Sequence, residues 1–153
     1  MLTIRGIADL EAARGTHVEG RWRTVTQAMI DAFADVCGDH QWIHVDTVRA
    51  LSESPYKTTI AHGFLTLSLL SVMLGECFSA PAFASINYGF ERIRFVAPVP
   101  SGARIRGRFA LGEVRDSAEG AVNLTWNVEV EIEGVAKPAL VATWIIRLAL
   151  SSC

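Results

Sequence analysis

The sequence lacks several features that mark common classes of protein. Its 14 basic and 16 acidic side chains leave a formal net charge of only −2, which argues against a nucleic acid or an anionic membrane as the main partner. The three cysteines, Cys37, Cys77 and Cys153, lie far apart and form no CxxC pair, so neither a disulfide framework nor a zinc–thiolate site is indicated. We therefore expect a cytoplasmic protein, without a secretory signal because no basic segment precedes an apolar run at the N-terminus.

A membrane-spanning run is also missing. The segment from Thr58 to Gly75 contains no charged residue, but threonine, histidine, glycine and serine interrupt it. Its apolar part, from Phe64 to Leu74, would rise only about 16 Å as a helix, against a bilayer core of about 30 Å. The pattern predicts a buried helix rather than a membrane span.

Apolar residues are abundant instead. Hydrophobic residues make up 50% of the 153 residues before the 12 glycines are counted, whereas a typical domain reaches roughly 45–50% with glycine included. The length fits a single domain spanning residues 1–153. Surplus apolar surface in so short a chain predicts a subunit interface, an apolar ligand tunnel, or both.

Helices are expected in the first half of the chain. Thr26 is a suitable N-cap for a helix that Gly38 ends, with apolar residues at a spacing of about 3.6. Those apolar residues are Met29, Phe33, Val36 and Cys37. The later helix from Phe64 to Leu74 is apolar nearly all round, so we expect the sheet or a second copy of the chain to enclose it.

From Ala84 onward the hydrophobic period becomes two, which predicts antiparallel strands. The segments 105–111 and 122–132 alternate apolar with polar residues, as strands with one buried and one exposed face do. The last strand, from Ala139 to Leu150, is apolar on both faces and is expected to be central or pressed against another subunit. Four strands packed against helices on one face place the chain in the α+β class.

The densest group of reactive side chains is GDHQWIHVD, from Gly38 to Asp46. Asp39 and His44 are close enough along this loop to converge on one water molecule, remove its proton and return a proton elsewhere. The alternative is that Asp39 only ends a helix and that His44 is a loop histidine with satisfied hydrogen bonds.

A metal site is another alternative, because His40 and His44 are four residues apart and His62 is available. However, Gln41 stands where the zinc-protease helix motif has its catalytic glutamate. We therefore expect no metal.

Three blocks of the sequence, FADVCGDHQWIHVD, IAHGFLTLSLL and INYGFERIRFVAPVPSG, resemble the MaoC-like dehydratases, which include the (R)-specific enoyl-CoA hydratases. With the trailing KPALVATWI, the resemblance covers most of the chain from Phe33 onward and is greatest to the branch that contains nodulation protein N. It implies a hot-dog fold, in which a curved antiparallel sheet wraps one long central helix. It also implies that pairs of subunits join their sheets.

The resemblance assigns roles to residues as well. Asp39 and His44 would position and activate water, and the backbone N–H of Gly89 would hold the thioester oxygen on which negative charge develops. Taken alone, Gly89 is equally consistent with a strand bulge. Ser68 matches a helix serine that faces the family's active site, although a serine there can also bond back to its own helix.

Two further pairs of residues belong to the expected site. His62 and Gly63 begin the central helix and would place the positive end of its dipole near the ligand; for His62, a capping or packing role is the alternative. Gln41 and Trp42 stand where many (R)-hydratases have Asn-Pro, which leaves the preferred acyl length open.

Coenzyme A would need cationic partners for its phosphates. The candidates lie mainly on the expected strands, where alternating arginines more often form a solvated face. They are Arg92, Arg94, Arg104, Arg106, Arg108 and Lys137.

The leading hypothesis is a homodimeric hydratase/dehydratase without metal or redox cofactor. Its substrates would be trans-2-enoyl and (R)-3-hydroxyacyl thioesters of coenzyme A or acyl carrier protein. A hot-dog thioesterase is disfavoured, because the segment from Thr58 to Gly75 lacks the carboxylate that such enzymes carry on or beside the central helix. A non-catalytic subunit that binds acyl thioesters is the remaining alternative.

Overall fold

The computed structural model describes residues 1–117 and 120–150. The helices are α1 (Ile7–Ala12), α2 (Gln27–Cys37), α3 (Trp42–Val45), α4 (Thr47–Glu53), α5 (Gly63–Ser68) and α6 (Leu70–Gly75). The strands are β1 (Leu2–Thr3), β2 (His17–Glu19), β3 (Arg23–Thr24), β4 (Phe78–Ser79), β5 (Phe83–Phe95), β6 (Arg104–Asp116), β7 (Val122–Ile132) and β8 (Val135–Leu150). The four long strands after the central helices were predicted, whereas β1 to β4 are too short to show an alternating pattern.

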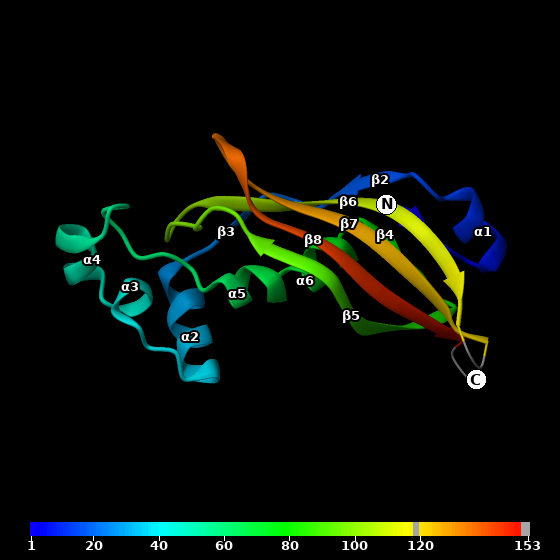
Figure 1. Ribbon diagram of the computed structural model, residues 1–153, viewed down its shortest axis with the longest axis horizontal. Helices are drawn as coiled ribbons and strands as arrows, with labels where there is room; N and C mark the ends of the chain where they lie inside the picture. Colours follow the sequence, from blue (N-terminus) through cyan, green and yellow to red (C-terminus); the bar gives the residue numbers. More distant parts are fainter. Residues whose placement is uncertain (118–119, 151–153) are drawn as a thin grey trace.

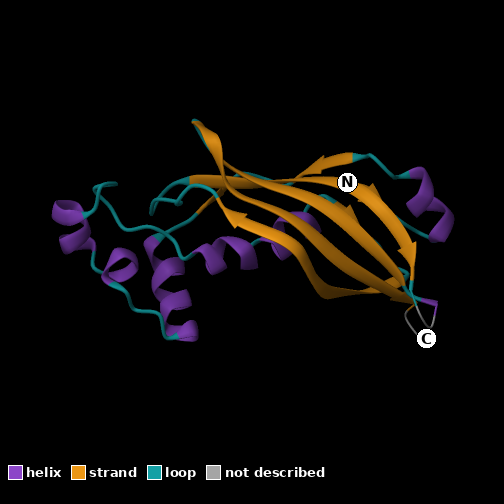
Figure 2. Ribbon diagram, in the orientation of Figure 1, coloured by secondary structure: helices purple, strands orange, loops and turns teal. Residues whose placement is uncertain are grey.

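One large sheet carries the fold. Its strand order is β2-β6-β7-β8-β5, with β3 also paired to β6, and all of its pairings are antiparallel. The short strands β1 and β4 pair in parallel in a separate sheet. The large sheet is curved, and α5 and α6 lie along one of its faces while α2, α3 and α4 extend past one end (Figures 1 and 2).

The alternating pattern sorts each strand into an inner and an outer face, as predicted. In β7 every second residue is buried, and the fully buried Trp126 packs edge-on against Phe78 and Phe109. β8 lies between β7 and β5, which confirms its central position. It begins at Val135 rather than Ala139 because it continues through Pro138.

The central helix differs from the expected one. The chain forms two short helices, α5 and α6, separated at Leu69, and only one side of them faces the sheet. Phe64 remains 66% exposed and Val72 42% exposed. One curved sheet covers only one side of these helices, so of the two expected covers, the sheet and a second copy of the chain, the sheet alone does not enclose them.

Local capping at α2 follows the prediction. The Thr26 hydroxyl accepts a hydrogen bond from the Met29 N–H at 3.3 Å, and Gly38 ends the helix in the left-handed conformation with a φ of 77°, which glycine adopts at low cost.

The expected apolar face of α2 is only half correct. Met29 and Phe33 pack against the core, but Val36 is 86% exposed and Cys37 is exposed as well. Both lie in the last turn of a helix that extends beyond the sheet (Figure 1), where nothing in the described part of the chain covers them.

The two described cysteines have different surroundings. Cys37 is exposed and Cys77 is buried, and burial, followed by the charge of Glu76, raises the pKa of the Cys77 thiol to about 11. The expected unpaired state holds for these two, whereas Cys153 lies outside the described residues. No helix in the described ranges combines the length and apolar character needed to span a bilayer.

Strand β5 forms one edge of the large sheet. Among the described strands it pairs only with β8, so the other side of its backbone offers unpaired N–H and C=O groups. Large apolar side chains are exposed along and just beyond it: Ile86, Tyr88, Phe95 and Val96.

Candidate active site

The loop between α2 and α4 carries the predicted reactive pair. Gly38 turns the chain out of α2, and α3 then forms one helical turn that the sequence analysis did not anticipate. The carboxylate of Asp46 accepts a hydrogen bond from the Arg49 N–H at 2.9 Å and so caps α4. Asp39 and His44 are thereby held on a short loop that is fixed at both ends.

The His44 imidazole is buried and has a defined orientation. His44 is only 8% exposed, and its Nδ1 lies 2.7 Å from the carbonyl oxygen of Ile60. Because a carbonyl oxygen can only accept, Nδ1 carries the proton and Nε2 of the neutral ring keeps a free lone pair. The geometry therefore presents His44 Nε2 as a base.

A second buried histidine lies against the first. His62 is 3% exposed, and its ring stacks on the His44 ring with a centroid distance of 3.8 Å and an interplanar angle of 24°. Its Nε2 donates to the backbone carbonyl of Asp39 at 2.9 Å, while its Nδ1 is buried and has no hydrogen-bond partner in the part of the chain that the structure describes.

Asp39 completes the cluster from the exposed side of the loop. One carboxylate oxygen accepts a hydrogen bond from the Gln41 N–H at 3.3 Å. The side chains of Asp39, His44 and His62 each offer one nitrogen or oxygen atom, and these three atoms lie within 4.8 Å of one another. The structure therefore brings the predicted Asp39–His44 pair together and adds His62 to it.

These three residues do not form a metal centre as they stand. The ring nitrogens of stacked imidazoles point side by side rather than toward one point, whereas metal–nitrogen bonds lie in the ring plane and converge on the ion. His40, the fourth candidate ligand, turns away and binds Asp35 at 2.9 Å, and this hydrogen bond raises the His40 pKa.

A cavity of about 280 Å³ opens beside His44. Gly63, the first residue of α5, lines it, and an added methyl group there would lie only 3.0 Å from the Phe95 ring. The start of α5 therefore approaches the end of β5 so closely that alanine at this position would push the Phe95 ring aside by a few tenths of an ångström. The remaining lining residues are mostly apolar: Ile60, Ala61, Thr66, Phe95, Val96, Ala97, Pro98, Val99 and Ala139.

Gly89, by contrast, does not line the His44 cavity. It lies at an irregularity in the pairing of β5 with β8, as the bulge interpretation predicted. An added methyl group at Gly89 would meet no heavy atom within 4 Å.

The other expected site residues point elsewhere. The Ser68 hydroxyl donates back to the Phe64 carbonyl at 2.8 Å, whereas Ser71, one turn later, lines a separate cavity of about 220 Å³ between α6, β5 and β8. Gln41 is exposed, and the ring of Trp42 lies under the Arg49 guanidinium, 4.3 Å from its carbon.

The arginines of β6 are paired with carboxylates across the outer face of the sheet. Arg104 binds Glu133 at 2.7 Å, and Arg106 binds Glu131 at 2.6 Å. The Arg106–Glu131 hydrogen bond lowers the Glu131 pKa. These contacts fit the solvated-face interpretation better than a phosphate site.

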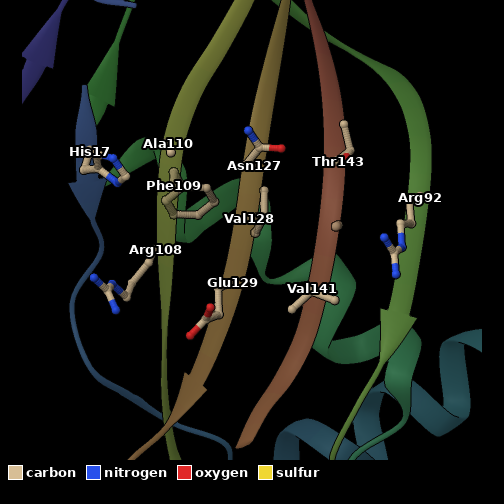
Figure 3. Close-up of a pocket in the computed structure, with 11 residues that line it drawn as sticks. His17, Arg92, Arg108, Phe109, Ala110, Asn127, Val128, Glu129, Val141 and Thr143 are labelled. Carbon is tan, nitrogen blue, oxygen red and sulfur yellow. The ribbon is translucent and has the colours of Figure 1, made fainter. Parts of the chain in front are cut away.

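A trough of about 430 Å³ lies on this outer face. Figure 3 shows Arg92 and Arg108 on opposite sides of it, with Asn127, Glu129 and Thr143 between them. Since Glu129 lines it together with Arg92 and Arg108, the trough contains both signs of charge, and it lies apart from the His44 cavity.

A family model described as MaoC like domain matches residues 9–132. The chain belongs to this family.

Relatives of this MaoC-like protein match over nearly its whole length. It is 47% identical over 149 residues to 3-hydroxyacyl-thioester dehydratase Z of Mycobacterium tuberculosis, a match that covers 96% of this chain and 98% of the relative. It is 51% identical over 144 residues to nodulation protein N of Rhizobium meliloti, covering 91% and 88%.

Solved structures agree with the architecture. The monoamine oxidase regulatory protein of Archaeoglobus fulgidus superposes with a TM-score of 0.77 at 25% identity, covering 91% of this chain and 92% of that one. An (R)-hydratase from A. caviae superposes with a TM-score of 0.70 at 23% identity, covering 89% and 96%. The predicted family and its α+β hot-dog fold are confirmed.

Two residues that hold the MaoC-like site were missed in the sequence. The side-chain amide of Gln27 donates to the His44 carbonyl at 2.8 Å, and the Gln27 side-chain oxygen accepts from the buried Thr59 hydroxyl. These partners are distant in sequence, so only the folded chain reveals them.

Replacing Gln27 by Ala should destabilise the protein by about 1–3 kcal/mol, because the Thr59 hydroxyl, which is buried, and the His44 carbonyl would both lose a partner. Urea unfolding measures the change. Gln41→Ala, which removes an exposed amide from the loop that carries His44, is the matched control. Its free energy of unfolding should stay within about 0.5 kcal/mol of the wild-type value. Equal losses in both variants would contradict the role given to Gln27.

Proposed function

We propose that this MaoC-like protein is a hydro-lyase that adds water to trans-2-enoyl thioesters and removes it from (R)-3-hydroxyacyl thioesters. The observation that carries the proposal is the Asp39–His44 pair, with the unprotonated Nε2 of His44 beside an apolar cavity. The 47% identity to a protein named 3-hydroxyacyl-thioester dehydratase Z supports the same chemistry.

In the hydration direction, each proton has a place to go. Asp39 orients a water molecule, and His44 Nε2 accepts its proton as the hydroxyl oxygen bonds to C3 of the enoyl group. Electron density moves from the C2–C3 double bond through C1 onto the thioester oxygen. When the C1 carbonyl re-forms, C2 takes the proton that His44 Nε2 had accepted, and the dyad returns to its starting state. Dehydration is the same sequence reversed.

The thioester oxygen needs a hydrogen-bond donor while it carries negative charge. We assign this role to the backbone N–H of Gly63, because Gly63 lines the His44 cavity and the first N–H of a helix has no partner within that helix. This replaces Gly89 of the sequence analysis, which lies outside the lining of the cavity.

The acyl group would occupy the cavity beside His44. Its walls are predominantly apolar and its volume is about 280 Å³, which suits a short acyl chain better than a long one. The carrier, coenzyme A or acyl carrier protein, would remain outside. The reaction requires only water and the thioester, and we place it in the cytoplasm, within one domain spanning the chain.

We further propose that the protein is a homodimer joined along β5. The free edge of that strand and its exposed apolar side chains provide unpaired backbone groups and apolar area together, which natural sheets normally cover.

Replacing Asp39 by Asn or His44 by Gln should lower the rate of crotonyl-CoA hydration by at least about 100-fold, since each change removes a group that handles the water proton. Loss of enoyl absorbance measures the rate. His40→Gln, an exposed histidine of the same loop, is the matched control and should keep wild-type turnover.

Near-normal hydration by either dyad variant would refute the assignment. Release of free thiol from an acyl-CoA by the wild type, without loss of enoyl absorbance on an enoyl-CoA, would favour the thioesterase alternative. Ligand binding with no turnover of any thioester would favour a non-catalytic subunit.

The oxyanion assignment distinguishes two glycines. Gly63→Ala should lower kcat for crotonyl-CoA by about 10-fold or more, because the new methyl group forces Phe95 and α5 apart by a few tenths of an ångström and misaligns the donor. Gly89→Ala places its methyl group in open space but at a φ of 158°, which an L side chain rarely adopts, so it should lower Tm but reduce kcat far less. The reverse order would restore Gly89 to the role.

The dimer can be tested at the exposed edge. Ile86→Glu places a charge on the proposed interface and should yield monomers in sedimentation velocity, whereas the wild type sediments as a dimer. Val135→Glu, an equally exposed apolar position on β8, should leave the dimer intact. A wild type that sediments as a monomer would refute the proposal.

A further inference from the structure

We propose that His62 is a positioning residue for the reaction: it fixes the backbone of Asp39 and the ring of His44 in one arrangement before substrate binds. This inference rests on the proposed hydratase function and gives His62 a task other than binding substrate or capping the helix. The buried His62 ring makes three contacts that support this role.

The first contact is the hydrogen bond from His62 Nε2 to the Asp39 carbonyl oxygen, at 2.9 Å. It joins the start of α5 to the residue whose carboxylate must orient water. Asp39 itself is exposed, and its carboxylate has only the Gln41 N–H, at 3.3 Å, as a hydrogen-bond partner among the described residues. The bond to its carbonyl therefore anchors a residue that is otherwise loosely held.

The second contact is the stacking of His62 on His44, with a centroid distance of 3.8 Å. It limits rotation of the His44 ring about the hydrogen bond to Ile60 and so holds the ring in one orientation.

The third contact shows that packing alone does not explain a histidine here. Phe33 packs against the ring with a centroid distance of 5.2 Å, and Nδ1 is buried without a partner in the described chain. A buried polar atom without a partner destabilises a fold, and phenylalanine would fill the same space without that cost. What phenylalanine lacks is the Nε2–H donor to Asp39.

Two variants distinguish the effect of the His62 hydrogen-bond donor from the effect of its stacked ring. His62→Phe keeps a stacking ring but removes the donor, and we expect kcat for crotonyl-CoA to fall at least 10-fold, KM to stay within about threefold, and Tm to equal or exceed that of the wild type. His62→Gln places an amide N–H near the former Nε2 and should recover most of the lost kcat. His40→Phe is the matched control and should leave kcat, KM and Tm unchanged.

A measurement that does not depend on turnover accompanies the kinetics. Hydrogen exchange of the backbone amides in residues 38–46 should accelerate in His62→Phe and return toward wild-type rates in His62→Gln. This pattern tests the positioning of the loop even if crotonyl-CoA is not turned over, an outcome that would instead count against the proposed function.

Three results would overturn the inference. One is a His62→Phe enzyme with kcat within twofold of the wild type. Another is a kcat loss accompanied by a lowered Tm that His62→Gln does not rescue, which would indicate a purely structural role. The third is an exchange rate of the loop amides that does not change in His62→Phe.

Discussion

The backbone of Ile60 holds the site to the rest of the molecule. Its carbonyl oxygen accepts the hydrogen bond from His44 Nδ1, and its N–H donates to the Ile43 carbonyl at 2.9 Å, while the next residue, Ala61, donates to Val99 at 2.8 Å. One extended segment thus connects the reactive loop to the chain that follows β5. The tautomer of His44, and with it the proton transfer proposed for its Nε2, depends on a carbonyl group that this segment holds in place.

The site also depends on how closely a helix approaches a strand. Because Gly63 has no side chain, the ring of Phe95 packs directly on the start of α5, and the cavity forms between this contact and His44. His62 directly precedes this first turn of α5 and contacts both Asp39 and His44. The adjacent residues His62 and Gly63 therefore meet opposite requirements. Gly63 leaves space because it has no side chain, whereas His62 fills buried space with a ring that donates a hydrogen bond.

Residues whose chemistry or period is visible locally were predictable. Asp39 and His44 stand out as reactive types on a short loop, and the alternation of residues 122–132 gives the inner face of β7 directly. Gln27 was not predictable, because its partners His44 and Thr59 lie 17 and 32 residues away. The break at Leu69 and the exposure of Val36 also escaped prediction, since both depend on how far a curved sheet reaches. The resemblance gave the thioester oxygen to Gly89, whereas Gly63 lines the cavity beside His44, because a shared motif does not fix which glycine faces a cavity.

Phe95 belongs at once to the unpaired edge strand and to the wall of the cavity. Any molecule that pairs with this edge therefore restrains one wall of the reaction chamber as well. In the dimer proposed along β5, assembly and turnover would therefore be coupled, and the activity of the chain would depend on its own concentration.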